Sequence, residues 1–235
     1  MAGFEQHLRV STGLGVVTGA AATFGFGFTP AQGILAAYLT SVSGMLPDLD
    51  SNSGKPLREM SNLTAAIVPM VMMERLKEWG GDFDTSLLLA ILVYTGIRFA
   101  GSWMVGKLSV HRGMFHSIPA LLIAGLAVFL GWKSDDTSVR ILMAASVGIG
   151  FLSHLILDEI YAVQWNGLAP ELNQFAGSAT KFFGKSAVAN IFTWTLLGGL
   201  TWLSLGRVGI VEEPAVPEPS EIREALQQIP GVERL

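Results

Sequence analysis

Cysteine is absent from this chain of 235 residues, so neither a disulfide framework nor a thiolate metal site can form. Charge is scarce as well: charged residues make up 14%, against about 25% in an ordinary soluble domain. The net charge of −4 and the lack of a basic run give no reason to expect a nucleic-acid partner. The N-terminus carries Glu5, His7 and Arg9 and lacks a small-residue cleavage site, so we expect the first apolar segment to be retained.

Hydrophobic residues are abundant, at 50% of the chain with a mean hydropathy of +0.48, and they are gathered into long runs. A membrane-spanning helix needs about 20 mostly apolar residues. Six runs meet or approach this length: residues 10–28, 31–46, 87–105, 118–132, 141–157 and 187–205. A seventh, residues 63–73, is short and contains Pro69. The sequence therefore predicts an all-α, polytopic transmembrane helical bundle of about seven helices, six clear spans and one short segment.

Composition divides the chain into two parts. Residues 1–210 are predicted to form the membrane helical domain, where Gly15 and Gly19 have the GxxxG spacing that favours close helix packing. Glycine is also simply common in membrane helices, and that alternative stays open. Residues 211–235 begin as an acidic, proline-rich linker and continue as a short amphipathic tail, for which Ser220 is a candidate N-cap.

The order of the spans places the polar motifs on one side of the membrane. If residues 63–73 cross, all four histidines and three of the seven aspartates fall on the same face. The other aspartates fall on the opposite face: Asp82, Asp84, Asp135 and Asp136. Near the helix ends, seven lysines and arginines lie on the histidine side and five on the other. By the positive-inside rule the histidine side is predicted to face the cytoplasm.

Two pairs of residues have a spacing that suits a divalent ion. His154 and Asp158 are four residues apart near a helix end, so both project from one face of that helix. Asp48 and Asp50 are two apart, and in an extended segment they point the same way, where a cation would offset their repulsion. The alternatives are a helix-end hydrogen bond for the first pair and a solvated loop for the second.

A third stretch, residues 111–117, combines histidines with a helix start. His111 and His116 lie five residues apart, and Ser117 is a candidate N-cap for the following helix. Arg112 is suited to bidentate capture of a phosphate or carboxylate. The alternative is an ordinary polar loop at the membrane interface.

Together these motifs predict a site for one or two divalent ions. Nitrogen and oxygen ligands without sulfur suit zinc first, with manganese, iron or magnesium as alternatives. Ionisable residues near a membrane are costly and are usually functional. The predicted ligands are His7, Asp48, Asp50, His111, His116, His154 and Asp158.

Four motifs, in their order along the chain, resemble the YdjM-like family of inner-membrane metal-dependent hydrolases. They are His7, the Leu-Pro-Asp-Leu-Asp run at 46–50, the run at 111–117, and His154 with Asp158. The resemblance extends from about residue 5 to about residue 160. It implies a multi-pass protein of the bacterial inner membrane that carries a metal. The chain has serine at position 51, where the family often has histidine, and phenylalanine at 115, where it usually has threonine. More distantly, the pattern is similar to zinc-dependent phospholipase C.

The function predicted from the motifs and the resemblance is that of a metal-dependent hydrolase of the phosphoesterase type, acting on a lipid or lipid-linked substrate. Arg112 would bind the phosphate, and Asp48 or Asp50 would act as general base. A metal transporter or sensor and a structural, partner-binding protein are the alternatives. A transporter needs polar groups deep within the spans, where Arg98 is the one charged residue and is assigned a structural role. Residues 159–185 are predicted to form a loop that either covers the site or rests at the lipid interface.

Overall fold

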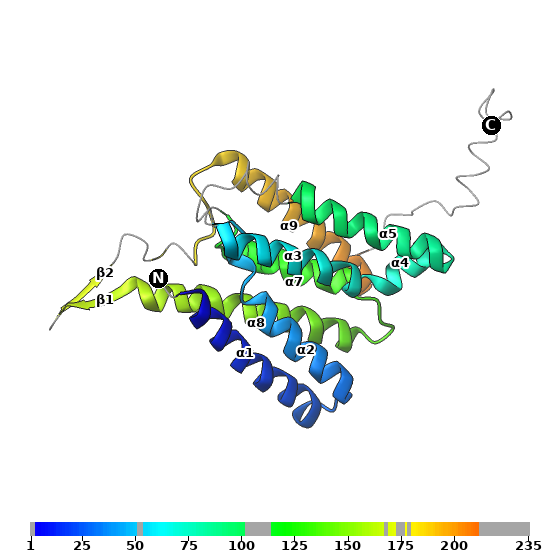
Figure 1. The fold of residues 1–235 in the computed structure, drawn as a ribbon, viewed down its shortest axis with the longest axis horizontal. Helices are drawn as coiled ribbons and strands as arrows, with labels where there is room; N and C mark the ends of the chain where they lie inside the picture. The colour runs from blue at the N-terminus through cyan, green and yellow to red at the C-terminus, as the bar shows by residue number, and fades with distance from the viewer. Residues whose placement is uncertain are drawn as a thin grey trace.

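The computed structural model describes residues 3–50, 54–101, 114–166, 169–172, 177 and 180–211. Within these ranges the side chains of residues 49–50, 54–61, 100–101 and 164–172 are not described. Helices make up almost all of the described chain, as Figure 1 shows, so the all-α prediction is confirmed. One short antiparallel hairpin is added to it. Residues 212–235, with the predicted linker and tail, lie outside the described residues.

The N-terminal part is a helical hairpin. Helix α1 (Phe4–Ala20) continues into a short π-helix, η1 (Ala21–Gly25), and α2 (Pro30–Ser43) returns the chain. The turn between them is held by a capping box, in which the Thr29 hydroxyl accepts from the Gln32 amide at 3.2 Å. A 3-10 turn, η2 (Leu46–Asp50), follows α2 and presents Asp48.

The described residues of the next part form three α-helices and a π-helix. The predicted short segment 63–73 overlaps the end of a longer helix, which ends at Val71, two residues after Pro69. The elements are α3 (Gly54–Val71), α4 (Met73–Gly80), α5 (Phe83–Thr95) and the π-helix η3 (Gly96–Gly101). Asp82 caps α5 by accepting from the Thr85 amide at 2.9 Å.

The C-terminal part supplies the central helix of the fold. The elements are α7 (Ile118–Gly131), α8 (Thr137–Ala162), β1 (Val163–Asn166), β2 (Ala169–Leu172) and α9 (Ala187–Arg207). The prediction of a loop over residues 159–185 was wrong at its start. Instead α8 continues to Ala162, and the two strands pair in antiparallel register, with Val163 opposite Leu172.

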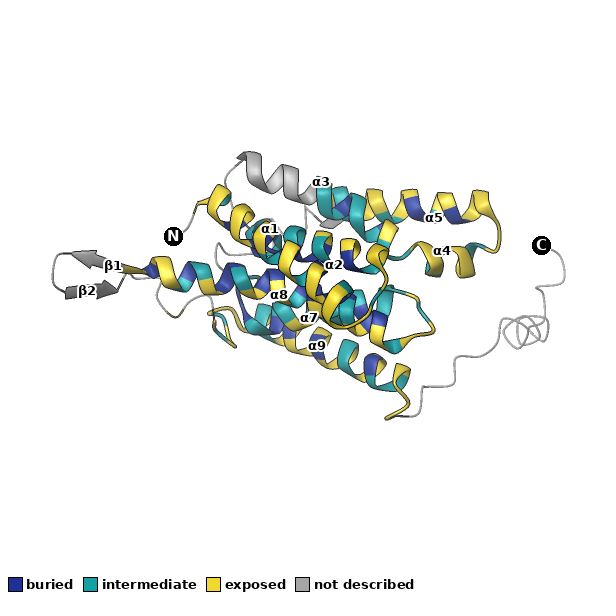
Figure 2. Cartoon of the chain, turned by 90° about the horizontal axis from the view of Figure 1, so that it is seen from below, coloured by how far each residue is buried: buried dark blue, intermediate teal, exposed yellow. Residues whose placement is uncertain are grey.

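Helix α8 lies at the centre, with α1, α2 and α7 packed against it and α9 packed on the far side of α7. The main buried cluster is formed by Leu39 of α2 and by Val139, Met143 and Val147 of α8. Side chains of α3, including Ile67, cover this cluster. The core therefore lies along α8, as the band of buried residues in Figure 2 shows.

Small residues bring α1, α2 and α8 into backbone contact. A Cβ atom added to Gly15 would lie 2.5 Å from the Ala37 carbonyl oxygen, and one on Gly150 would lie 2.0 Å from that of Thr40. Real Cβ atoms do not approach so closely, so these positions require glycine. The close packing expected from Gly15 and Gly19 is confirmed, since Gly19 meets the Gly33 carbonyl in the same way. This packing fixes the end of α2 against α8.

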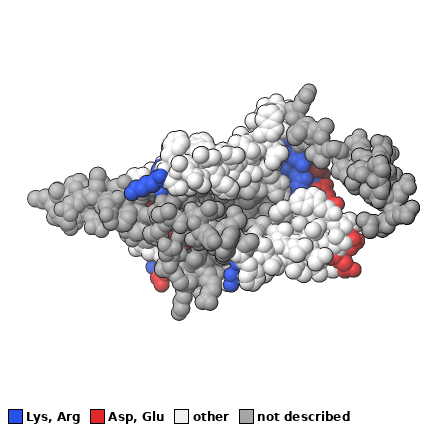
Figure 3. Space-filling view, turned by 90° about the horizontal axis from the view of Figure 1, so that it is seen from above, with Lys and Arg blue, Asp and Glu red and all other residues white. Residues whose placement is uncertain are grey.

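Among the described helices, two, α8 and α9, are long and apolar enough to cross a membrane by length and composition. The count of about seven spans is not confirmed, because α2 and α7 have 14 residues each. A helix of that length covers about 21 Å, less than the hydrocarbon core of about 30 Å. Large apolar side chains nevertheless face outward: on α9, Val188 is 70% and Ile191 is 68% exposed. Figure 3 shows broad uncharged surfaces on one face of the described residues, with charged groups in a few separate clusters.

Candidate metal centre

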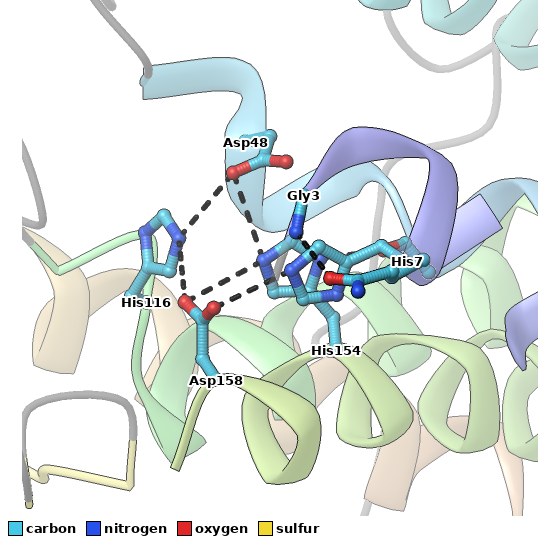
Figure 4. Close-up of polar contacts among 8 residues, drawn as sticks. Gly3, His7, Asp48, His116, His154 and Asp158 are labelled. Carbon is cyan, nitrogen blue, oxygen red and sulfur yellow. Dashed lines mark hydrogen bonds and ion pairs between the residues drawn. The ribbon is translucent and has the colours of Figure 1, made fainter. Parts of the chain in front are cut away.

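Five of the seven predicted ligands are brought together at one end of the helices, as Figure 4 shows. His7 comes from the first turn of α1, Asp48 from the turn after α2, and His116 from the segment just before α7. His154 and Asp158 share one face of the last turns of α8. Four separate parts of the chain thus meet at a single cluster.

The Nε2 atoms of the histidines lie around the carboxylates of Asp158 and Asp48. The Asp158 carboxylate places Oδ1 3.4 Å from His7 Nε2, and Oδ2 3.9 Å from His154 Nε2 and 4.0 Å from His116 Nε2. Asp48 Oδ1 lies 3.6 Å from His154 Nε2 and 3.7 Å from His116 Nε2. Most of these separations are too long for hydrogen bonds. They are close to the roughly 3.3–3.5 Å between neighbouring ligand atoms of a tetrahedral ion with bonds of about 2.0–2.1 Å.

His154 is oriented as a metal ligand. Its Nδ1 lies 2.7 Å from the Gly44 carbonyl oxygen. A carbonyl oxygen can only accept, so Nδ1 donates, and in the neutral ring Nε2 carries the lone pair. That Nε2 atom is buried and, within the part of the chain that the structure describes, has no hydrogen-bond partner, yet it faces the carboxylates of Asp48 and Asp158. A lone pair that faces two carboxylates is satisfied by a cation between them, so the residues fit a divalent ion.

Among the described residues of the cluster, four side chains are buried and one is partly exposed to solvent. His7, His116, His154 and Asp158 are all buried, whereas the Asp48 side chain is 25% exposed. Burial raises the pKa of the Asp48 carboxyl, but the facing side chain of His116 leads the opposing effects that hold that pKa below its ordinary value. Asp48 therefore stays ionised, and among the described residues of the cluster it is the one that solvent reaches.

Gly44 is a functional residue that the sequence reasoning missed. A Cβ atom on it would lie 2.3 Å from the Ser11 Cβ, so only glycine lets α1 pack over this point. Ser11 is buried and donates to the Ser41 carbonyl at 2.9 Å, which ties α1 to the end of α2. A residue that orients a metal ligand through its backbone carbonyl leaves no side-chain motif in the sequence. The one available signal was a glycine that ends a helix four residues before Asp48.

Other predictions have separate outcomes. The N-cap role of Ser117 is confirmed, since its hydroxyl accepts from the Ala120 amide at 3.2 Å. The side chains of Asp50, His111 and Arg112 lie outside the described residues, as does Ser51, so their roles stay predictions. Phe115 is half-buried beside His116. Arg98 lies 5.4 Å from the centre of the Phe99 ring, a contact in keeping with a structural role.

Apolar helices and a buried histidine–aspartate cluster define a helical membrane protein with a candidate metal centre. A family model described as YdjM inner membrane protein matches residues 1–213, so the chain belongs to that family. The resemblance seen in the motifs is thereby confirmed. The match runs well past residue 160 and includes α9, beyond the last motif. No curated protein and no solved structure matches the chain.

Proposed function

We propose that the protein is a multi-pass inner-membrane hydrolase that cleaves a phosphoester of a lipid or lipid-linked substrate with the help of a divalent metal. Five described residues would hold the metal: His7, Asp48, His116, His154 and Asp158. The observation that carries the proposal is the buried Nε2 of His154, fixed by the Gly44 carbonyl and aimed at two carboxylates.

The donor set of imidazole and carboxylate suits zinc, and it also accepts manganese, iron or magnesium. A divalent ion in such a site lowers the pKa of a water molecule and offsets the negative charge of phosphate oxygens. Among the described residues, Asp48 is the ionised group at the open side of the cluster, where it can accept a proton from water. The sequence adds Asp50 as a second candidate base and Arg112 as the residue that would bind the phosphate.

The multi-pass arrangement is supported by helical continuations that lengthen two of the shorter helices. Helix α1 and η1 form one helical run from Phe4 to Gly25, and α5 and η3 form another from Phe83 to Gly101. Each run falls in the range of about 17–25 residues that a span requires. The outward apolar side chains of α5 and α9 find a favourable environment in lipid. The charge difference between the helix ends supports a cytoplasmic site.

The absence of cysteine makes this topology testable by single-cysteine labelling. Lys185 precedes α9 at the end that carries the site, and Asp135 lies in the turn between α7 and α8 at the other end; both are exposed. In intact cells, a membrane-impermeant maleimide should label Asp135→Cys and leave Lys185→Cys unlabelled until the membrane is opened. Labelling of both variants in intact cells, or of neither in opened cells, would contradict the proposed spans.

The activity is tested with the full chain in mild detergent, loaded with zinc or manganese. Phospholipids in mixed micelles would be compared with the soluble ester p-nitrophenyl phosphate, which separates lipid from soluble substrates. We expect phosphoester cleavage that is lost on chelation and that falls by on the order of 10² in kcat in Asp48→Asn. A metal-loaded protein that cleaves none of these esters would refute the hydrolase proposal. Metal flux through proteoliposomes would then test the transporter alternative.

A further inference from the structure

The three histidines of the metal centre do not face one common point. The rings of His7 and His154 are stacked, with centroids 3.7 Å apart and planes inclined by only 12°. The rings of His116 and His154 have centroids 5.5 Å apart and planes inclined by 61°. Figure 4 shows the stacked pair beside Asp158, with His116 on the other side of that carboxylate.

Ring orientation decides which histidines can share an ion. The lone pair of an imidazole nitrogen lies in the ring plane, and a bound ion lies along it at about 2.0–2.1 Å. The ring planes of His116 and His154 are inclined by 61°, so the lone pairs of these two rings can converge on one ion. An ion between the stacked rings of His7 and His154 would lie out of both planes by about half their 3.7 Å separation, nearly a full bond length. These two histidines therefore suit two different ions.

We propose that the centre is dinuclear. His116, His154 and Asp48 hold one ion, His7 holds the other, and the Asp158 carboxylate bridges them. Asp158 Oδ1 faces His7 at 3.4 Å, while Oδ2 faces His154 at 3.9 Å and His116 at 4.0 Å, so its two oxygens are directed to the two groups. This assignment deepens the proposed function and rests on it for the presence of a metal.

The spacing of the stacked rings supports the assignment. Parallel rings that present Nε2 to the same carboxylate hold their ions about as far apart as the rings themselves. The 3.7 Å between the centroids of His7 and His154 matches the separation of about 3.5–4 Å found in two-metal hydrolytic sites. The Nε2 atom of His154 also belongs to both groups of potential ligands, yet it has one lone pair and can serve one ion only.

The two ions should bind with unequal affinity. The Gly44 carbonyl fixes the ring of His154, whereas His7 Nδ1 is buried and, among the described residues, has no hydrogen-bond partner. Partners that orient a ligand are worth about 10–100-fold in metal affinity. The His154 ion should therefore bind about 10–100-fold more tightly than the His7 ion.

Manganese binding to the full-length, chelator-treated protein in detergent tests the assignment. Calorimetric titration should give two equivalents in two phases, and electron paramagnetic resonance should show spin coupling once the second ion enters. His7→Ala should keep one tight equivalent with an uncoupled signal, and His7→Asn serves as a second variant if the alanine variant does not fold. Glu5→Ala, an exposed neighbour in the same helical turn, is the matched control and should keep both ions.

One equivalent in the wild-type protein, or two coupled ions in a folded His7 variant, would overturn the dinuclear assignment. Either result leaves the hydrolase proposal standing, because one ion suffices for activity. Two coupled ions in a protein that cleaves no phosphoester would instead support the dinuclear centre and refute the hydrolase. The two proposals therefore fail in distinguishable ways.

Discussion

The two ends of helix α8 differ in how their polar side chains are paired. At the N-terminal end three charged groups have protein partners. Arg140 donates through Nε to the Trp132 carbonyl at 3.1 Å, Asp136 caps α8 through the Ser138 amide at 2.8 Å, and Lys133 pairs with Glu78. At the C-terminal end, the side chains of His154 and Asp158 are buried. The oxygens of Asp158 lie 3.4–4.0 Å from the Nε2 atoms of His7, His116 and His154.

This difference separates structural from functional polar residues. Charges at the N-terminal end cap α8 and join α4 to the turn before it, with protein groups as their partners. A buried group of lone pairs and carboxylates at the other end costs free energy unless a cation enters. A cation held there would offset that cost, and this is why we assign the proposed activity to this end.

The largest expected effect comes from neutralising the bridging carboxylate. Asp158→Asn should lower metal affinity by more than about 100-fold, because it removes a charge that faces three histidines. Metal should stabilise the wild-type protein by about 2.7 kcal/mol at a concentration of 100 times Kd, and should not stabilise the variant. Thermal unfolding with zinc and with chelator measures both. A variant that unfolds far below the wild type in chelator would show that Asp158 is structural.

The next effect tests the packing that holds the site together. Gly150→Ala drives a Cβ into the Thr40 carbonyl oxygen, 2.0 Å away, and should cost about 1–3 kcal/mol and weaken metal binding. Gly148→Ala, on the same helix, meets nothing nearer than the Leu121 side chain at 4.0 Å and is the matched control. Equal unfolding temperatures for the two variants would contradict the close approach of α2 and α8.

A smaller effect is expected at the opposite end of the bundle. Asp82→Ala removes the N-cap of α5, which accepts hydrogen bonds from the Thr85 amide and hydroxyl. The same hydrogen bonds hold the pKa of Asp82 below its ordinary value. The Tm should fall by less than in Gly150→Ala, with metal affinity unchanged. A loss of metal binding in this variant would show that the two ends are not independent.

The smallest effect concerns the ion pair at that same end. The hydrogen bond and charge of Lys133 hold the pKa of Glu78 below its ordinary value. A lowered pKa in the folded state means stabilisation above the ordinary carboxyl pKa, which is lost as the pH falls through the lowered one. Glu78→Gln should lower Tm slightly at neutral pH and not in acid, because exposed ion pairs contribute little. Unfolding scans at several pH values test this, and an effect that grows in acid would contradict it.

Much of the helical layout could be predicted, because uncharged runs bounded by polar residues mark helices in this chain. Within the described residues, each predicted run overlaps a helix, including the short one that contains Pro69. The gathering of His7, Asp48, His116 and His154 was predicted by counting seven crossings, a count that the structure does not confirm. The hairpin after Ala162 was not predicted, although residues 163–166 alternate apolar and polar side chains and lead into Asn-Gly, because a run of four residues is a weak strand signal. The Gly44 carbonyl and the stacking of His7 on His154 depend on backbone packing, which no side-chain motif encodes.

Counting the metals bound to the purified protein is the most direct test of the functional end of α8. The full chain would be purified in mild detergent without added metal or chelator and measured by elemental mass spectrometry. Beside it would stand a double variant, Asp48→Ala with His154→Ala, and a control from the other end, Glu78→Gln. We predict about one or two equivalents of a divalent metal in the wild type and the control, and none in the double variant. No metal in any preparation, even after reconstitution with zinc or manganese, would contradict the account.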